Sequence, residues 1–562
     1  MAKIGKNVLE NLTQAMYDDS RVIFREYIQN SADQIDYALK NNSFPHEKLE
    51  IYINLDARKK CISICDNANG IPSAEVENRL GNVADSYKVQ GETKGFRGIG
   101  RLGGIGYCKQ LRFITSYAGE DVKSIMTWDA ARLREIISDP QNHKTAEEVL
   151  GEIIHIDHKP CEKEKHFFEV EMNEINSEND ALLDFRNIKQ YLSEVAPVDF
   201  NETFYLDEKI NKFLDDHKDE IPHPQTYNIF LVKNGGSMEQ IHKGYGTTIY
   251  KLVQNNKKER WDSLYDIHTD IIRNSKGLPI AWIWYGISSF RGAITLSVNP
   301  MRGLRLRQFN IQIGDRDTLS ASPKFFKEDR GNSYFIGEVH TIDKNLRPNA
   351  RRDYFNESSA TSDFEYALKE YISNHLDSLY QAGSKVNSSY DKLKKYTTLK
   401  EELKRREQQG FASPYEREKM KQNLEEAHKK AETAVKNITR IEERAKNQPN
   451  SDLAQMFNAI EKTQKIDFKH VLETPNEDGS SAEKFKGKTN KTTLKSEKSK
   501  TKSKIIESKK PKLMVDELAN LTRSERKLVS RIYDVINENL IIDEANSLIT
   551  KIQEELKKPH VS

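Results

Sequence analysis

The hydrophobic positions of the first 200 residues alternate between helical and strand periodicities. Between Arg21 and Lys40, apolar residues recur close to every third or fourth position, which predicts a helix. These residues are Val22, Phe24, Tyr27, Ile28, Ile35 and Leu39. Two apolar runs follow, LEIYINLD and CISICD, and each has the length and composition of a strand. We therefore expect a helix and two neighbouring strands of one sheet.

Residues from about 225 to 385 form a second region that is rich in strand-forming residues. Its apolar runs are YNIFLV, GTTIYKL, IAWIWYG, GAITLSV and NIQIG. The most apolar stretch of the chain, residues 277–290, lies here and is too short to span a bilayer. We expect this stretch to form a pair of core strands in a mixed α/β region.

The pattern changes near Asn387, where Lys, Glu, Arg, Gln and Ala replace most branched apolar residues. This composition favours a long solvated helix or a helical hairpin that is interrupted at residues 410–414. The apolar seam is thin, so the pattern does not by itself indicate a long, regular coiled coil. Twelve lysines between Lys484 and Lys512 then predict a disordered segment, and an amphipathic end predicts a small helical module tethered by it.

Together these patterns predict an α+β protein of several domains. The expected parts are an N-terminal α/β domain (1–200), a mixed α/β middle domain (201–385), a helical or coiled region (386–470), a disordered Lys-rich linker (471–512) and a C-terminal helical module (513–562).

The composition constrains the partners and the compartment. The formal net charge is +2, from 88 basic and 86 acidic side chains, so any attraction to nucleic acid requires a local patch. The four cysteines (Cys61, Cys65, Cys108 and Cys161) contain no CxxC pair, which argues against a zinc site or a disulfide framework and fits a reducing compartment. No apolar signal-peptide core is present near the N-terminus, so we expect a cytoplasmic protein without a membrane partner.

The first candidate block is the run from Glu26 to Asp33, EYIQNSAD. A spacing of four places Glu26 and Asn30 one turn apart on the same face of a helix. A carboxylate there can orient and deprotonate a water, and an amide oxygen beside it can hold Mg²⁺, which prefers oxygen ligands. A polar helix face is the ordinary alternative explanation of this block.

The second block, DNANGI, begins at Asp66 directly after the CISIC run. A buried aspartate at a strand end can accept a hydrogen bond from an exocyclic amine such as that of adenine. Gly70 would let the backbone approach such a ring closely. An ordinary turn is the competing explanation.

The third block, residues 95–106, contains a GxGxxG pattern at Gly98, Gly100 and Gly103. Glycine-rich loops that open onto a helix bind phosphates through their backbone amides. A Rossmann fingerprint would follow the first strand of a βαβ unit and lead to an acidic residue about twenty positions later. This block comes third, after a long polar segment, which disfavours the Rossmann interpretation.

In this order the three blocks resemble the GHKL superfamily, whose members include the heat-shock protein 90 chaperones, type II topoisomerases, the mismatch-repair MutL proteins and histidine kinases. The resemblance spans roughly residues 10–200 and is nearest to the heat-shock protein 90 pattern. VIFREYIQNSADQIDYA resembles the ATP helix of that family, and ISICDNANGIPSAEVENRLGNVADS its adenine-binding strand and lid entry. GFRGIGRLGGIG resembles its phosphate loop. The resemblance implies a Bergerat-type α/β sandwich that binds ATP and Mg²⁺.

The resemblance also implies roles for single residues. Glu26 is the expected general base, Asn30 the expected magnesium ligand, and Asp66 the expected acceptor of the adenine amine. The expected nucleotide-binding residues are Asn30, Asp33, Asp66, Gly70, Asn82, Gly98, Ile99, Gly100 and Gly103. Residues from about Asn82 to Gly95 are the expected mobile lid.

A second resemblance lies in the middle region, at IGEVHTIDKNLRPNARRDYF (336–355). In the chaperones this segment supplies an asparagine and an arginine to the γ-phosphate. The shared pattern, Asn-x-x-Arg followed by an acid, falls on Asn349, Arg352 and Asp353. An arginine suits this role because its fixed, charged fork stabilises the charge that develops during phosphoryl transfer. A basic surface loop is the alternative.

The chain departs from the family pattern in one motif. The family has a Gly-Thr pair at a strand start after the phosphate loop, and this chain reads KHFFEVEM at 165–172 instead. The pair at Gly246-Thr247 lies about 75 residues too late and is expected to be a turn. We expect His166 to be a surface or strand residue rather than a substitute for the threonine.

Three functions are consistent with these features. The first is an ATP-hydrolysing clamp resembling the heat-shock protein 90 chaperones, with an expected homodimer and a protein client. The second is a nucleic-acid-associated ATPase of the MORC or MutL kind, acting in bacterial antiviral defence, with Lys484–Lys512 binding phosphate backbones. The third is a scaffold whose partner binding is gated by ATP.

Overall fold

The protein is described by a computed structural model that covers residues 4–13, 19–83, 94, 100–320, 323–464, 466–472, 513–540 and 542–558.

The alternation of apolar and polar residues along its strands shapes the first sheet. Every second residue of β1 (Glu50–Asp56) and β2 (Cys61–Asp66) is buried, so one face of both strands lies in the core. The two strands pair antiparallel, as the sequence predicted.

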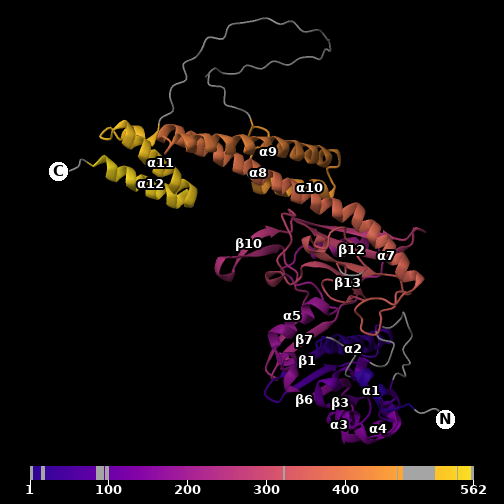
Figure 1. The fold of residues 1–562 in the computed structure, drawn as a ribbon. Helices are drawn as coiled ribbons and strands as arrows, with labels where there is room; N and C mark the ends of the chain where they lie inside the picture. The colour runs from indigo at the N-terminus through magenta and orange to yellow at the C-terminus, as the bar shows by residue number, and fades with distance from the viewer. Residues whose placement is uncertain are drawn as a thin grey trace. The chain divides into compact units, whose positions relative to one another are not determined.

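These strands belong to an eight-stranded sheet with the order β5-β4-β3-β6-β2-β1-β7-β8. Figure 1 labels β1, β3, β6 and β7 of this sheet. The other members are β3 (Cys108–Ser116), β4 (Val122–Asp129), β5 (Ile154–Pro160), β6 (Phe167–Ile175), β7 (Asn228–Lys233) and β8 (Ser237–Gln240). All neighbours are antiparallel except β1 and β7. The sequence pattern grouped the run YNIFLV with the middle region, but this run forms β7, which pairs with β1. The first sheet therefore extends beyond the expected domain boundary at residue 200.

Five helices accompany this sheet. They are α1 (Asn7–Thr13), α2 (Val22–Lys40), α3 (Ala130–Ser138), α4 (Ala146–Ile153) and α5 (Phe185–Val195). α2 contacts β2, and α3 contacts β3. The predicted helix from Arg21 to Lys40 therefore exists, and its apolar residues join one core with those of β1 to β7.

The middle region contains a hairpin and a second sheet. The hairpin consists of β9 (Thr248–Val253) and β10 (Lys257–Ser263). The second sheet has the order β11-β12-β15-β13-β14. Its strands are β11 (Asp266–Arg273), β12 (Pro279–Ile287), β13 (Gly303–Gln308), β14 (Ile311–Gln312) and β15 (Ile336–Thr341), and helices α6 (Asp207–Asp216) and α7 (Ser359–Tyr371) contact β11.

Two strand predictions in this region are wrong. The apolar stretch 277–290 forms one strand, β12, rather than a pair, because β11 and β15 cover its two edges. Such a central strand is nearly continuously apolar, since both of its faces are buried. The run GAITLSV forms no strand, and a short 3-10 helix (Leu296–Val298) stands in its place.

The chain divides into two compact units, residues 1–381 and 382–562. The second unit holds most of α8 (Asp377–Gln409), which begins in the first, together with α9 (Pro414–Asn447), α10 (Asp452–Gln464), α11 (Arg523–Asn539) and α12 (Ile542–Lys557). The predicted hairpin break falls at Gly410, whose φ of +106° favours glycine, and Ser413 caps α9. The α+β multidomain fold class is confirmed.

Two features of the second unit differ from expectation. The buried residues of α9 recur at intervals of four and three (Ala427, Ala431, Ala434, Ile438, Ile441 and Ala445), so its apolar seam is regularly spaced. The seam is thin because alanine fills most of it. The C-terminal helices pack on the turn between α8 and α9, where Tyr533 and Ala412 share one apolar cluster. The predicted disordered linker lies almost entirely outside the described residues.

Candidate functional site

Helix α2 carries the first candidate block. Most of this helix is buried, so its polar side chains enter the interior together with its apolar ones. Glu26 and Asp33 are buried, with 6% and 7% of their surface exposed, and Asn30 between them is half-buried. The block is therefore not a solvated helix face, because the helix lies between a sheet and its neighbours rather than on the surface.

An arginine from the middle region reaches Glu26. The Nε atom of Arg352 lies 3.0 Å from Oε1 of Glu26, and the exposed fractions of the two side chains are 13% and 7%. Arg25 adds a second cation, with its Nε 3.8 Å from the same oxygen. The other carboxylate oxygen, Oε2, lies against Gly100, where an added Cβ would come within 2.4 Å of it. The carboxylate of Glu26 is thus enclosed by two cations and a glycine.

The loop that bears Arg352 has an unusual backbone. Arg352 has a φ of +55°, in the left-handed region that non-glycine residues adopt only when their surroundings enforce it. Its carbonyl accepts the amide of Gly314 at 2.8 Å, and its amide donates to the carbonyl of Asn349 at 3.2 Å. Arg25 also holds this loop, because its Nη2 donates to the carbonyl of Arg351 at 3.1 Å. These bonds turn the Arg352 side chain toward α2.

The other members of the middle-region pattern have local partners. The side-chain amide of Asn349 donates to the carboxylate of Asp353. The backbone amide of Asn349 donates to the carbonyl of Tyr354 at 2.9 Å. The structure therefore brings Arg352, but not the amide of Asn349, to the carboxylate on α2.

Period-two alternation places Asp66 in the interior. Ile62, Ile64 and Asp66 are the buried positions of β2, so the carboxylate follows two apolar side chains onto the face that packs against α2. Asp66 has no exposed surface, and its Oδ1 accepts the amide of Ala68 at 3.2 Å. In the neighbouring strand β6, Phe168 stands opposite Asp66. An aromatic side chain therefore stands next to Asp66 across the sheet.

Gly70 has a structural reason to be glycine that is independent of any ligand. Gly70 has a φ of +70°, and a Cβ there would lie 2.0 Å from the carbonyl oxygen of Ser116 and 2.9 Å from that of Phe167. The backbone of β3 and the first residue of β6 approach Gly70 so closely that only glycine fits there.

His166 lies neither on the surface nor within a strand, which differs from the expected placement. His166 is buried, precedes β6, and stacks on Phe44 with ring centroids 3.7 Å apart. Its Nδ1 lies 2.9 Å from the carbonyl oxygen of Ala68, and its Nε2 lies 3.2 Å from a carboxylate oxygen of Glu47. Both ring nitrogens have partners, so this histidine holds the segment after Asp66 in place.

The glycine-rich block is described from Gly100 onward. Residues Gly100–Gly106 form a 3-10 helix in which Gly103 is buried, instead of the start of an α-helix. The hydroxyl of Tyr27 anchors this helix, because it donates to the carbonyl of Arg101 at 3.0 Å and accepts the amide of Gly104 at 2.9 Å. Gly98 and Ile99 lie outside the described residues, as does the expected lid except for residues 82, 83 and 94. Asn82 is exposed, and its carbonyl accepts a bond from Arg101.

Lys94 lies between α2 and Arg352. It is 5% exposed, and its amide donates to Oδ1 of Asp33 at 2.8 Å. Its ammonium pairs with Asp36, and its carbonyl accepts Nη2 of Arg352 at 3.2 Å. No sequence pattern marked Lys94, Tyr27 or Arg25 as a functional residue, although Tyr27 was expected on the apolar face of the helix. For Arg25 and Tyr27 the available signal was their place beside Glu26, whereas no local pattern marks Lys94.

A second polar cluster is buried in the five-stranded sheet. Glu338 has no exposed surface and bonds to Lys243 at 2.7 Å, to His340 at 2.9 Å and to Arg307. Burial alone would raise the pKa of Glu338, but Arg307 and Lys243 hold this pKa well below its ordinary range. Burial lowers the pKa of Lys243 to about 8 and that of His340 to about 4. Each ion has a partner, as buried charges require.

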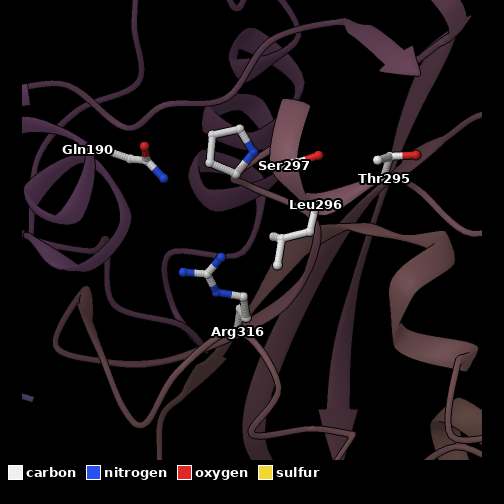
Figure 2. A pocket seen from close by; sticks show the side chains of 6 residues that line it. Gln190, Thr295, Leu296, Ser297 and Arg316 are labelled. Carbon is white, nitrogen blue, oxygen red and sulfur yellow. The ribbon is translucent and has the colours of Figure 1, made fainter. Parts of the chain in front are cut away.

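A hollow of about 530 Å³ lies apart from these residues. It is lined by Gln190 of α5, by Thr295, Leu296, Ser297 and Pro300, and by Arg316 (Figure 2). None of the residues predicted for the nucleotide site lines it. The described part of the chain holds no group of three or more His, Cys, Asp or Glu that could bind a metal ion. No helix in the same ranges is long and apolar enough to cross a membrane.

Known proteins match the part of the chain that carries these residues. Residues 21–166 match the family model described as histidine kinase-, DNA gyrase B- and HSP90-like ATPase. Residues 21–166 are therefore an ATPase domain of the GHKL superfamily, near the heat-shock protein 90 family.

Several bacterial proteins named chaperone protein HtpG are similar to this chain. The protein from Halalkalibacterium halodurans is 29% identical over 113 residues, which cover 18% of each chain. That from Ruthia magnifica is 28% identical over 141 residues, or 22% of this chain and 23% of the relative. One from Clostridium botulinum is 31% identical over 110 residues, again 18% of each. The matches span about a fifth of the length of these relatives.

Proposed function

We propose that this chain is a Mg²⁺-dependent ATPase that works as a conformational clamp, in the manner of the heat-shock protein 90 proteins that its first domain resembles. One observation carries the proposal. Arg352 and Glu26 are 326 positions apart in the sequence, yet their charged groups meet at 3.0 Å. A cation from the middle region beside a buried carboxylate in the GHKL domain is the arrangement that a two-part active site requires.

The residues of α2 fit a nucleotide with its metal. Mg²⁺ keeps several waters and takes one or two protein oxygens besides the phosphates, so the single amide oxygen of Asn30 suffices as a protein ligand. Bound Mg²⁺ would neutralise phosphate charge. In this proposal Glu26 accepts a proton from the attacking water, and Asp66 accepts a hydrogen bond from the adenine amine. Gly100 and Gly103 border the phosphates, together with Gly98 and Ile99.

Arg352 has a free edge for the developing charge. Its Nε forms an ion pair with Glu26, and its Nη2 donates to the carbonyl of Lys94. No hydrogen bond or ion pair of its Nη1 is seen among the described residues. The proposed role of Arg352 is to present this remaining edge to the γ-phosphate. Asn349 would first have to exchange its bond to Asp353 in order to act there.

The purpose of the clamp is part of the proposal. The relatives are named chaperones, which supports a protein client. A homodimer and a cytoplasmic location belong to the proposal through the resemblance to the heat-shock protein 90 family. A specific sequence feature supports nucleic acid as the second candidate partner, namely the twelve lysines between Lys484 and Lys512.

Steady-state ATP hydrolysis by the full chain tests the proposal. Glu26→Ala and Arg352→Ala should still bind ATP but lose at least about a hundredfold in kcat. Arg302→Ala, which removes an ordinary Arg–Asp pair with a separation of 3.4 Å, is the matched control and should hydrolyse ATP like the wild type. Full activity in Arg352→Ala would refute the two-part site. Stimulation of hydrolysis by DNA would favour the nucleic-acid partner, and suppression of client aggregation without DNA would favour the chaperone role.

A further inference from the structure

Lys94 is held by α2 and by the segment that contains Gln225 and Tyr227. Its ammonium carries three donors, and the structure offers a partner for each of them: the carboxylate of Asp36, the amide oxygen of Gln225 at 3.1 Å and the ring of Tyr227, whose centroid is 5.1 Å away. Its amide bonds to Asp33 at 2.8 Å. A buried lysine needs such compensation, since an unpaired ammonium in the interior is strongly disfavoured.

The partners of Lys94 are themselves fixed. The hydroxyl of Tyr227 donates to the second oxygen of Asp36 at 2.5 Å. Burial raises the pKa of this hydroxyl, and the bond to Asp36 raises it further, so the hydroxyl stays a donor. The carbonyl of Gln225 accepts the side-chain amide of Asn310 at 3.0 Å, and the carbonyl of Asn310 accepts Nη1 of Arg307 at 2.9 Å. Lys94 is thus tied to α2 and, through Gln225, to the buried cluster of the five-stranded sheet.

The remaining polar group of Lys94 faces the proposed active site. Its carbonyl accepts Nη2 of Arg352 at 3.2 Å, while Nε of the same guanidinium contacts Glu26 at 3.0 Å. Two contacts on a planar guanidinium fix both its position and its rotation. One contact is with the carboxylate of Glu26. The other is with the backbone carbonyl of Lys94, a residue that is anchored by its own ammonium.

We propose that Lys94 is a positioning residue for Arg352. The ammonium anchors the Lys94 backbone to Asp36 and Gln225, and the anchored carbonyl sets the orientation in which Arg352 presents its free edge. The inference rests on the proposed ATPase function and adds to it a residue that touches neither the nucleotide nor the water. Loss of the ammonium should therefore misalign the arginine rather than prevent ATP from binding.

The test uses the full chain with Lys94→Met, which keeps the length of the side chain and removes its charge. The expected result is a fall in kcat of about tenfold or more, with a change in KM for ATP of less than about threefold. Lys94→Arg, which can still pair with Asp36, should recover most of the rate. Lys109→Met is the matched control, because it makes the same substitution in a surface Lys–Glu ion pair whose charged atoms are 2.7 Å apart. This variant should leave kcat unchanged.

A double mutant separates positioning from general damage to the fold. If Lys94 acts through Arg352, Lys94→Met should cause no further loss in an Arg352→Ala background. Asp36→Asn provides a second way to weaken the anchor if Lys94→Met does not fold, and its effect on kcat should likewise vanish in that background. An equal loss with and without Arg352, or wild-type kcat in both Lys94→Met and Asp36→Asn, overturns the inference.

The two proposals fail in different ways. If the wild type hydrolyses no ATP, or Arg352→Ala hydrolyses it normally, the proposed function is wrong and so is the role of Lys94. If Arg352→Ala is impaired while Lys94→Met and Asp36→Asn are not, only the role of Lys94 is wrong.

Discussion

Replacing Gly100 by alanine should impair ATP hydrolysis selectively. Gly100 is the first residue of the 3-10 helix at Gly100–Gly106. An added Cβ would lie 2.4 Å from Oε2 and 3.4 Å from Cδ of Glu26. Glycine is therefore needed here because the carboxylate fills the space where a side chain would begin.

The structure sets the size of the effect. Ordinary contacts of a Cβ begin near 3.4 Å, so the carboxylate oxygen must retreat by about 1 Å to admit the methyl group. A misplacement of about 1 Å at a reacting group can lower a rate about a hundredfold. The side-chain end of Glu26 can move without shifting the backbone, so the free energy of unfolding should fall by no more than about 1–2 kcal/mol.

The assay is steady-state ATP hydrolysis alongside equilibrium binding of ATP. Gly100→Ala should lower kcat by about a hundredfold while the dissociation constant for ATP changes by less than about fivefold. Gly151→Ala is the control, since a Cβ there meets nothing within 4 Å, and it should behave as the wild type. In a Glu26→Ala background the added methyl has no carboxylate to displace, so Gly100→Ala should cause no additional loss.

The reasoning would be refuted by a Gly100→Ala protein that is folded and hydrolyses ATP at the wild-type rate. The position of the Glu26 carboxylate would then not limit the reaction. A loss that persists undiminished in the Glu26→Ala background would also count against it, because the damage would lie elsewhere in the phosphate loop.

Three further predictions concern stability, and each is measured by chemical denaturation. Gly70→Ala should lower the free energy of unfolding by about 2–4 kcal/mol, because its Cβ would lie 2.0 Å from the immobile carbonyl of Ser116; a loss below about 0.5 kcal/mol would contradict this. Tyr27→Phe should cost about 1–3 kcal/mol, since the two bonds of its hydroxyl to the 3-10 helix are buried, and an unchanged stability would show that they are dispensable. Burial lowers the pKa of His340 from 6.5 to about 4, so the unfolded chain binds a proton that the folded chain does not. The free energy of unfolding should therefore fall by up to about 3 kcal/mol as pH drops from 6.5 toward 4. His340→Gln should flatten this pH dependence. An equally steep dependence in the variant would show that His340 does not cause it.

Local periodicity explains what could be predicted from the sequence. A spacing of four on a helix places Glu26 and Asn30 on one face whatever the helix packs against, and alternation along a strand carries Asp66 inward behind Ile62 and Ile64. The superfamily followed from the order of three short motifs, and the match over residues 21–166 confirms it. The loop at Gly410 and the helices on either side were likewise visible in composition and turn residues.

Other features depended on contacts that no local pattern encodes. β7 joins the first sheet because β1 offers it an open edge, so a boundary drawn by composition near residue 200 precedes two strands of that sheet. The stretch 277–290 could not be assigned as one strand or two by hydrophobicity alone, since that choice depends on which strands cover its edges. The sequence also carried no sign that backbone carbonyls of the sheet lie so close to Gly70 that a side chain is excluded there.

The sequence by itself determined the three motifs, in α2, β2 and the glycine-rich block, whose order identifies the GHKL superfamily, because spacing and alternation act over a few residues. Only the tertiary structure decided what surrounds Glu26. Arg352 reaches that carboxylate from 326 positions away, and Lys94 holds the arginine through its backbone carbonyl, which every residue possesses. Such contacts depend on how distant segments close and pack against one another, and side-chain identity alone does not reveal them.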